Sequence, residues 1–248
     1  MITYRQGAKV DIPEIKGTPN FHIKGLDGND YGRYDQVAVT RYDNQFQLHC
    51  NRWPGVQTPQ WIRDEQIKWG KPVHDFTHIT GGLESDKTFR PPFHVQVRTR
   101  LPYRSDILPS VWLLNDCDKN PTRELDMFET GFSWKPRIWF ADHTGAANYE
   151  NRVMYKIEPF LVPCGMNQYD LFVSYTDAKW YVNGRLIKFR SGDWNYDYRL
   201  LVTLIVCRST ARDYTWEIEK IAVEADNVSA MCSLGIKSTA LSNLTNDN

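Results

Sequence analysis

The sequence lacks any long apolar run and any excess of charge of one sign. No stretch of its 248 residues approaches the roughly 20 apolar residues of a membrane-spanning helix, and its first residues lack the apolar core of a secretory signal. Thirty basic residues balance thirty acidic ones, so the summed charge gives no long-range attraction to nucleic acid or to an anionic membrane. We therefore expect a neutral partner, and neither nucleic acid nor membrane.

Several common chemical motifs are missing as well. The five cysteines form no C-x-x-C pair, and the chain has no G-x-S-x-G elbow and no phosphate-binding glycine loop. These absences argue against a cysteine-based zinc site, a dense disulfide framework, and the usual serine hydrolases and nucleotide enzymes. We expect no metal ligands and no cofactor, although a structural calcium ion held by backbone carbonyls would leave no trace in the sequence.

A long region between two predicted strands holds three tryptophans and two histidines. Trp53, Trp61 and Trp69 would serve equally well in loop packing or in sugar binding. His74 and His78 have the spacing of a zinc-binding H-x-x-x-H motif, but that motif needs a helix to bring positions four apart together. Since this region predicts a loop that enters a strand, we expect both to be surface histidines.

Segments typical of β-strands fill most of the chain. From residue 34 onward, short stretches rich in β-branched and aromatic residues recur between turn residues, and several alternate apolar with polar side chains, as in FHVQVR at 93–98. About a dozen such strands without a convincing amphipathic helix predict an all-β fold, a two-sheet β-sandwich. Asn183-Gly184 predicts a hairpin turn, since both residue types tolerate positive φ.

Composition divides the chain into three parts. Residues 1–33 are rich in Gly, Pro and Asp and predict an irregular N-terminal lead-in, whereas residues 34–225 carry the predicted strands and form the β-sandwich domain. Residues 226–248 are small and polar, which is typical of a tail that contacts assembly partners. We expect an extracellular or particle-associated location, although the sequence has no secretory signal.

The most informative stretch is RELDMFETG, which contains three acids. Because side chains alternate along a strand, Glu124 and Asp126 share a face, whereas Glu129 would point to the other face. A β-bulge at Met127-Phe128 would return Glu129 to the face of the other two. Like charges at this spacing raise one another's pKa, so a row of three carboxylates needs a reason.

Retaining glycosidases supply such a reason. They need two carboxyl groups about 5 to 5.5 Å apart, one ionised as the nucleophile and one protonated as the general acid, later the base. We assign Glu124 as the nucleophile and Glu129 as the acid/base, with Asp126 hydrogen-bonding the nucleophile and helping to keep a proton on the acid. The alternative is an edge strand whose charged side chains face solvent and block aggregation.

In context, the stretch resembles the bulged E-x-D-x-x-E signature of glycoside hydrolase family 16, whose members include laminarinases, lichenases, agarases and carrageenases. The resemblance covers roughly residues 34–224 in order. PSVWLLN resembles the family's P-A-x-W-L-L strand, DHTGAAN stands in the place of its His-containing strand, and YTDAKWYVNGRLI resembles its W-Y-V-D-G hairpin. The resemblance implies a concanavalin A-like jelly roll with a concave substrate cleft.

The resemblance also implies roles for single residues. Glu124 takes the nucleophile role, Glu129 the acid/base role and Asp126 the supporting role. Trp112 would flank the sugar bound next to the cleavage point, and His143 would reach the leaving-group side.

Three further residues complete the predicted substrate-binding set. Trp139 is a second stacking candidate, Asn115 ends the W-L-L strand, and Arg123 stands where laminarinases usually carry Gly. An arginine here would favour an anionic galactan over a neutral β-glucan, unless it points away from the site. Trp180 and Trp216 are expected in the core instead, because each lies in an alternating run that buries one face between sheets.

Together these residues predict an endo-acting, retaining glycoside hydrolase. Its substrate would be a β-linked polysaccharide of the β-1,3-glucan or marine galactan type, cleaved by double displacement. The alternative is a non-catalytic glycan-binding or structural jelly-roll domain of a viral or cell-surface assembly. The missing signal and the polar tail favour the alternative, whereas the intact row of acids favours the enzyme.

Overall fold

A computed structural model describes residues 21–23, 28–29, 32–42, 45–56, 58, 60, 63–64, 67, 73, 75–102, 104–115, 123–130, 137–144, 149–156 and 165–230. These residues form 17 strands, more than the dozen that the alternating apolar pattern predicts, together with the 3-10 helix η1 (Gln36–Ala38). The strands are β1 (Phe21–Ile23), β2 (Gly28–Asn29), β3 (Gly32–Tyr34), β4 (Val39–Tyr42), β5 (Gln45–Val56), β6 (Phe76–Thr80), β7 (Gly82–Ser85), β8 (Lys87–Thr99), β9 (Ile107–Asn115), β10 (Arg123–Thr130), β11 (Arg137–Thr144), β12 (Tyr149–Lys156), β13 (Asn167–Val173), β14 (Asp177–Val182), β15 (Arg185–Ser191), β16 (Tyr198–Val206) and β17 (Tyr214–Ala230).

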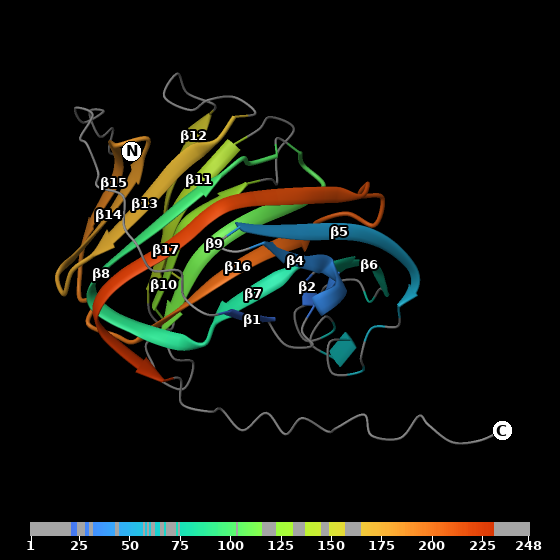
Figure 1. The fold of residues 1–248 in the computed structure, drawn as a ribbon, viewed down its shortest axis with the longest axis horizontal. Coiled ribbons are helices and arrows are strands. Elements are labelled where there is room, and N and C mark those ends of the chain that lie inside the picture. The colour runs from blue at the N-terminus through green and yellow to red at the C-terminus, as the bar shows by residue number, and fades with distance from the viewer. Residues whose placement is uncertain are drawn as a thin grey trace.

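The strand pairings define two layers (Figure 1). We call the sheet that contains β10 the front sheet, whatever the view, and it runs β1-β7-β16-β9-β10-β11-β12. The other sheet, which we call the back sheet, runs β4-β5-β17-β8-β13-β14-β15. The two sheets are joined where Tyr198 of β16 pairs with Phe89 of β8, and β6 pairs with β5 at the edge of the back sheet. Within the described part of the chain, only β3 and β6 pair in parallel. The predicted two-sheet jelly-roll sandwich is confirmed.

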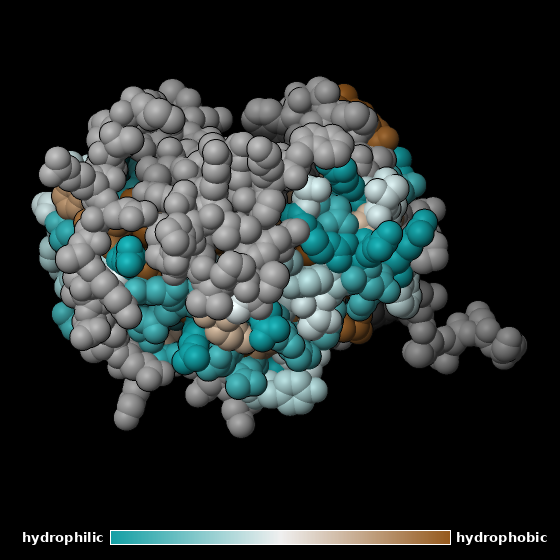
Figure 2. All heavy atoms as spheres, turned by 90° about the horizontal axis from the view of Figure 1, so that it is seen from above, coloured by the Kyte–Doolittle hydropathy of each residue, from teal (hydrophilic) through white to brown (hydrophobic). Residues whose placement is uncertain are grey.

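One large hydrophobic core lies between the two sheets. It takes inward side chains from β5, β8–β11 and β13–β17, and the predicted core residues Trp180 and Trp216 are both 0% exposed. In β8, Val95 and Val97 face this core, as the alternation in FHVQVR predicts. On the face of the molecule drawn in Figure 2, the coloured residues are mostly hydrophilic, as expected when apolar side chains lie between the sheets.

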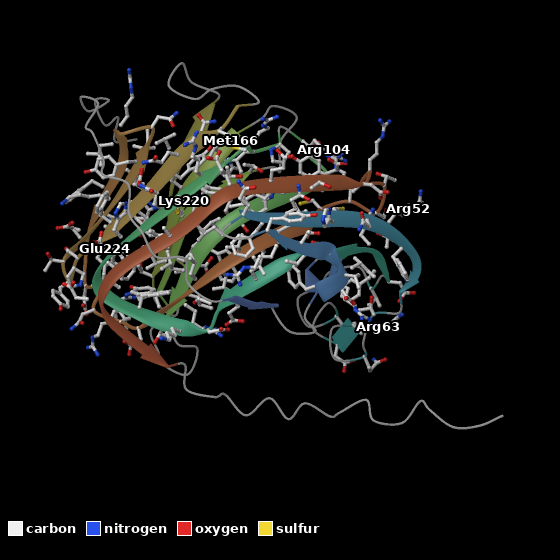
Figure 3. All side chains as sticks on the ribbon, in the orientation of Figure 1. Arg52, Arg63, Arg104, Met166, Lys220 and Glu224 are labelled. Carbon is white, nitrogen blue, oxygen red and sulfur yellow. The ribbon has the colours of Figure 1, made fainter. Side chains whose placement is uncertain are left out.

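The outer face of the back sheet is polar even where it is buried. Asp170 of β13 is 1% exposed and hydrogen-bonds His94 (2.9 Å) and Gln96 (3.0 Å) of β8. Lys220 of β17, labelled in Figure 3, donates to Gln96 Oε1 over 3.0 Å. A buried carboxylate in this position is stabilised by its donors.

The ends of the chain contain more strand than the composition predicts. β1 and β2 lie within residues 1–33, where β1 pairs with β7. At the other end, β17 continues to Ala230, past the predicted start of the tail at residue 226, because it pairs with β8 as far as Lys87. Residues 231–248, on which the predicted assembly contacts depend, lie outside the described residues.

Three smaller predictions can also be compared with the structure. Asn183 (φ 48°) and Gly184 (φ 76°) form the predicted turn between β14 and β15. His78 is not a surface residue: it is 0% exposed and its Nε2 is 2.9 Å from the Ala211 carbonyl oxygen. Trp53 is 54% exposed, whereas His74 and the other two tryptophans of that region lie outside the described residues. Among the described residues no helix has both the length and the apolar character needed to cross a membrane.

Candidate active site

Strand β10 contains the predicted β-bulge. Toward β11 the pairing skips from Asp126 to Glu129, and toward β9 it skips from Asp126 to Phe128. Met127 is therefore the extra residue, and Met127 and Phe128 both lie in the core, with 1% and 0% of their surface exposed. The bulge compensates for the odd spacing and returns Glu129 to the face of Glu124.

The register with β11 shows that the three acids share one face. Opposite them lie His143, Ala141 and Trp139, which are alternate residues of a single strand. The acids differ in burial: the side chain of Glu124 is 28% exposed and that of Asp126 is 1% exposed, while Glu129 is half-buried. We call these three acids the carboxylate row. Its two glutamates can be reached by solvent, and its aspartate cannot.

Two tryptophans lie beside the row, one on each neighbouring strand. Trp112 of β9 pairs with Asp126, and Trp139 of β11 pairs with Glu129. Both are half-buried. Trp112 Nε1 donates to Thr203 Oγ1 on β16 over 3.2 Å, which fixes the orientation of the indole. The predicted stacking residues are therefore next to the row, and their contact with sugar stays a prediction.

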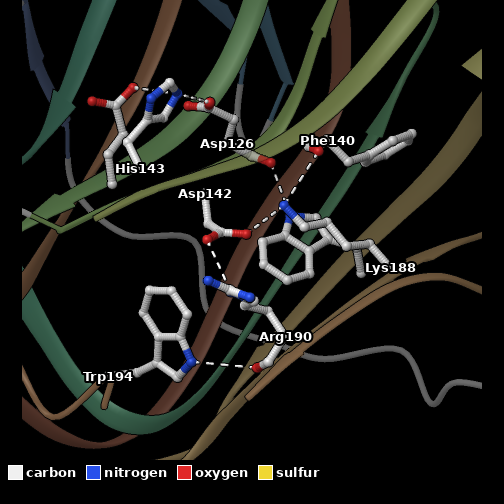
Figure 4. A network of polar contacts seen from close by, with 9 residues as sticks. Asp126, Phe140, Asp142, His143, Lys188, Arg190 and Trp194 are labelled. Carbon is white, nitrogen blue, oxygen red and sulfur yellow. Dashed lines mark hydrogen bonds and ion pairs between the residues drawn. The ribbon is translucent and has the colours of Figure 1, made fainter. Parts of the chain in front are cut away.

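His143 connects two members of the row. Its Nε2 lies 3.0 Å from Asp126 Oδ2 and 3.9 Å from Glu124 Oε1 (Figure 4). The short contact is a hydrogen bond to a carboxylate with 1% of its side chain exposed, and such a bond orients both groups. Glu124, Asp126 and His143 also offer ligand atoms within 4.8 Å of one another, a spacing that a cation could use. Glycoside hydrolysis by two carboxyl groups requires no metal ion.

Arg123 and Asn115, two members of the predicted substrate-binding set, do not share the face of the carboxylate row. Arg123 neighbours Glu124 along the strand and shares the core-facing parity of Leu125, so it lies on the side away from the carboxylate row. Its guanidinium carbon is 5.3 Å from the ring centroid of Tyr196. Asn115 is 2% exposed, and its Oδ1 accepts a hydrogen bond of 2.8 Å from the Arg123 backbone N–H. Asn115 therefore joins β9 to β10, and its contact with a substrate stays a prediction.

Residues of β16 on the acidic face were not predicted from the sequence. Thr203 accepts from Trp112 and lies 2.7 Å from Ser110 Oγ, while Arg199 forms a part-buried ion pair with Glu84 of β7. The signal was present, because YRLLVTLIV alternates and places Arg199 and Thr203 on one face. The sequence does not show that this face is the face of the carboxylate row, because that depends on the pairing of β16 with β9.

Comparison with known sequences and structures gives contrasting results. No family model matches this sequence, and no curated protein matches it either. Among solved structures, the laminarinase catalytic domain of Thermotoga maritima matches with a TM-score of 0.64 at 15% identity, covering 88% of this chain and 95% of that one. The κ-carrageenase of Pseudoalteromonas carrageenovora matches with a TM-score of 0.65 at 11% identity, covering 85% and 89%.

A third similar structure carries the family's name in its description. It is a glycoside hydrolase family 16 protein of Bacteroides ovatus bound to a mixed-linkage glucan product, with a TM-score of 0.61 at 16% identity, covering 84% of this chain and 94% of that one. Identity this low establishes the fold and leaves the activity to be tested. The chain has the jelly-roll fold of glycoside hydrolase family 16.

Proposed function

We propose that this protein is an endo-acting, retaining glycoside hydrolase with Glu124 as the nucleophile and Glu129 as the acid/base. The observation that carries the proposal is the bulge in β10, which brings both glutamates to one face beside Asp126 and His143. A solvated edge strand, the alternative reading of the same acids, is disfavoured because β10 is paired on both sides.

The spacing of the two glutamates along β10 supports double displacement. With the bulge between them they are separated like residues four apart on a regular strand, about 13 Å along the backbone. By leaning toward each other over the shorter Asp126, the two long side chains would shorten this span toward the separation that retention requires. Glu124 would attack the anomeric carbon while Glu129 protonates the departing oxygen, and Glu129 would then activate the water that releases the sugar.

Asp126 and His143 would keep the two glutamates in different protonation states. A buried carboxylate between two acids disfavours a second negative charge nearby, which helps Glu129 to hold its proton. The hydrogen bond from His143 would limit the movement of Asp126, and Glu124 would act as the ionised nucleophile. Environments that push two carboxyl groups apart in pKa are the usual basis of such a division of roles.

The proposed substrate is a β-linked polysaccharide that stacks on Trp112 and Trp139. The similar solved structures include laminarinases and a κ-carrageenase, so β-1,3-glucan and marine galactan are both candidates. The segments that connect the front-sheet strands, residues 116–122, 131–136 and 145–148, lie outside the described residues, and the cleft with open ends that endo action requires is part of the proposal.

A reducing-sugar assay tests the proposal directly. The wild-type protein is incubated with laminarin, mixed-linkage glucan, agarose, carrageenan and porphyran, and we expect activity on one of them. Glu124→Gln should lower kcat by at least about a thousandfold, since it removes the nucleophile. Glu129→Gln should lower it by about a hundredfold to ten-thousandfold, the usual contribution of general acid–base catalysis.

Glu217→Gln provides the matched control. Glu217 is an exposed glutamate of β17 in the back sheet, so the same chemical change there should leave kcat unaltered. NMR analysis of the first-formed product would show retention of the anomeric configuration. A wild-type protein that binds one of these glycans but cleaves none would refute the hydrolase and support the glycan-binding alternative.

A further inference from the structure

The backbone of the bulge is held from behind by a tryptophan of the other sheet. Trp180 of β14 is 0% exposed, and its Nε1 donates a 2.8 Å hydrogen bond to the backbone oxygen of Asp126. The strand ladder of β10 is interrupted just after Asp126 on both sides. The indole therefore donates to a buried carbonyl that lies directly beside this break.

Lys188 holds the ring of Trp180 and the adjacent strand β11 together. This β15 residue is 1% exposed, and its Nζ lies 4.6 Å from the centroid of the Trp180 ring. The same ammonium pairs with Asp142 Oδ1 at 2.6 Å and lies 3.4 Å from the Phe140 backbone oxygen. One buried cation thus contacts the indole from one sheet and two residues of β11 from the other.

The ion pair is placed directly behind the carboxylate row. Asp142 is 0% exposed and faces the core, while the next residue, His143, faces the row and contacts Asp126. Arg190 Nε adds a second cation 3.3 Å from Asp142 Oδ2. Taking such charges out of water is costly, and a buried ion pair is often no more stabilising than an apolar pair of the same size. The position of the Lys188–Asp142 pair behind the carboxylate row points to a role in positioning the row.

We propose that Trp180 is a positioning residue for the carboxylate row, acting through the Asp126 carbonyl, and that Lys188 and Asp142 hold Trp180 and β11 in register with it. The effect on the reaction rests on the proposed function, whereas the effect on the bulge does not. Small displacements remote from the reacting atoms lower turnover strongly, because the two carboxyl groups must meet one anomeric carbon.

The test replaces the indole with a ring that cannot donate a hydrogen bond. Trp180→Phe keeps an aromatic ring in the core, and Trp216→Phe makes the identical change at another fully buried tryptophan, whose Nε1 donates to Thr99 Oγ1. Hydrogen–deuterium exchange of peptides covering residues 123–130 reports on the bulge. Turnover of the glycan that the wild-type protein cleaves reports on the reaction.

We expect different results from the two variants. In Trp180→Phe, exchange within β10 should accelerate about tenfold for the lost hydrogen bond. Its kcat should fall about tenfold to a hundredfold while KM stays within about twofold, since the change acts on the reacting geometry. Trp216→Phe should alter neither. If Trp180→Phe leaves exchange and kcat at wild-type values, or if Trp216→Phe changes them equally, the proposal is wrong.

The exchange measurement also separates this proposal from the proposed function. A wild-type protein without activity on any glycan would refute the hydrolase, and exchange in the two variants would still decide whether Trp180 holds the bulge. Should Trp180→Phe fail to fold, Lys188→Met provides a second test, with Lys188→Met/Asp142→Asn removing both charges together.

The single and double variants distinguish positioning from stability. Lys188→Met leaves Asp142 buried without its lysine and should lower both stability and kcat. The double variant should regain stability, since no carboxylate charge is left without its lysine, yet keep the low kcat. Recovery of kcat together with stability would show that the ion pair has a structural role only and would overturn the part of the proposal that concerns Lys188.

Discussion

At the scale of single residues, strand parity decides which side chains can take part in the chemistry. Alternation along β10 predicts that Glu124 and Asp126 share the face of the carboxylate row. The same alternation turns Arg123 to the opposite face, where its guanidinium lies over the ring of Tyr196. The side of β10 on which Arg123 lies could therefore have been predicted from the sequence alone. The contact between His143 and Asp126 could not, because it depends on the register between β10 and β11.

Removing His143 should impair the reaction more than the fold. His143→Ala deprives the buried Asp126 carboxylate of a 3.0 Å hydrogen bond, and a bond to a charged group has an effect of about tenfold to a hundredfold. We expect kcat/KM on the cleaved glycan to fall by that factor. His143→Gln retains an N–H donor and should recover part of the loss.

His49→Ala is the control for this substitution. His49 of β5 also has both ring nitrogens within hydrogen-bond distance of side chains, 2.9 Å from Thr40 Oγ1 and 3.0 Å from Thr215 Oγ1. It lies in the back sheet, so kcat/KM should stay at the wild-type value. Equal losses in both alanine variants would mean that His143 acts only through stability.

At the scale of elements, the local sequence predicted the hairpin turn and the β-bulge but not the contacts between the two sheets. The Asn183-Gly184 turn follows from residue preference, and the bulge follows from the spacing of three acids that only one extra residue can align. The bond from Trp180 to Asp126 joins residues 54 apart in sequence and on different sheets. Nothing in either segment alone identifies the other, so the sequence predicted a core tryptophan but not its hydrogen bond.

Replacing Gly184 should destabilise the β14–β15 hairpin. Its φ of 76° is a conformation that residues with a Cβ adopt at a cost, so Gly184→Ala should lower the free energy of unfolding by about 1 kcal/mol. Urea denaturation measures the loss. Ser191→Ala, at the exposed end of β15, should stay within about 0.5 kcal/mol of the wild type. An unchanged midpoint in Gly184→Ala would contradict the strain argument.

At the scale of the whole molecule, the alternation of apolar and polar residues predicted the β-sandwich, while pairing with β8 extends β17 beyond the predicted domain boundary. Residues 226–230 read DNVSA, with little preference for a strand, yet they complete β17. Their backbone groups pair with β8 from Arg90 to Lys87, and such pairing overrides weak local propensity. A boundary drawn from composition alone therefore ended the domain too early.

Burial of titratable groups makes the stability of the whole fold depend on alkaline pH. Burial raises the pKa of the Cys50 thiol from 9.0 to about 12, and it also raises the pKa of the Tyr198 phenol above its ordinary 10.0. For both groups the unfolded chain loses its proton first, so stability falls as pH rises. Burial lowers the pKa of Lys188, and its effect on stability is opposite to that of the thiol and the phenol. The folded chain loses this proton before the unfolded chain does, so stability rises with pH toward 10.5.

Removing the Cys50 thiol should therefore flatten the alkaline decline. Above pH 9.0 the unfolded thiol ionises while the buried one does not, and the wild-type fold loses about 1.4 kcal/mol for each further pH unit from this group. Urea denaturation at about pH 8 and about pH 10 should show Cys50→Ala losing about 1.4 kcal/mol less than the wild type between the two. Cys207→Ala, which removes a half-buried thiol, should decline as the wild type does. An equally steep decline in Cys50→Ala would show that the thiol ionises alike in both states.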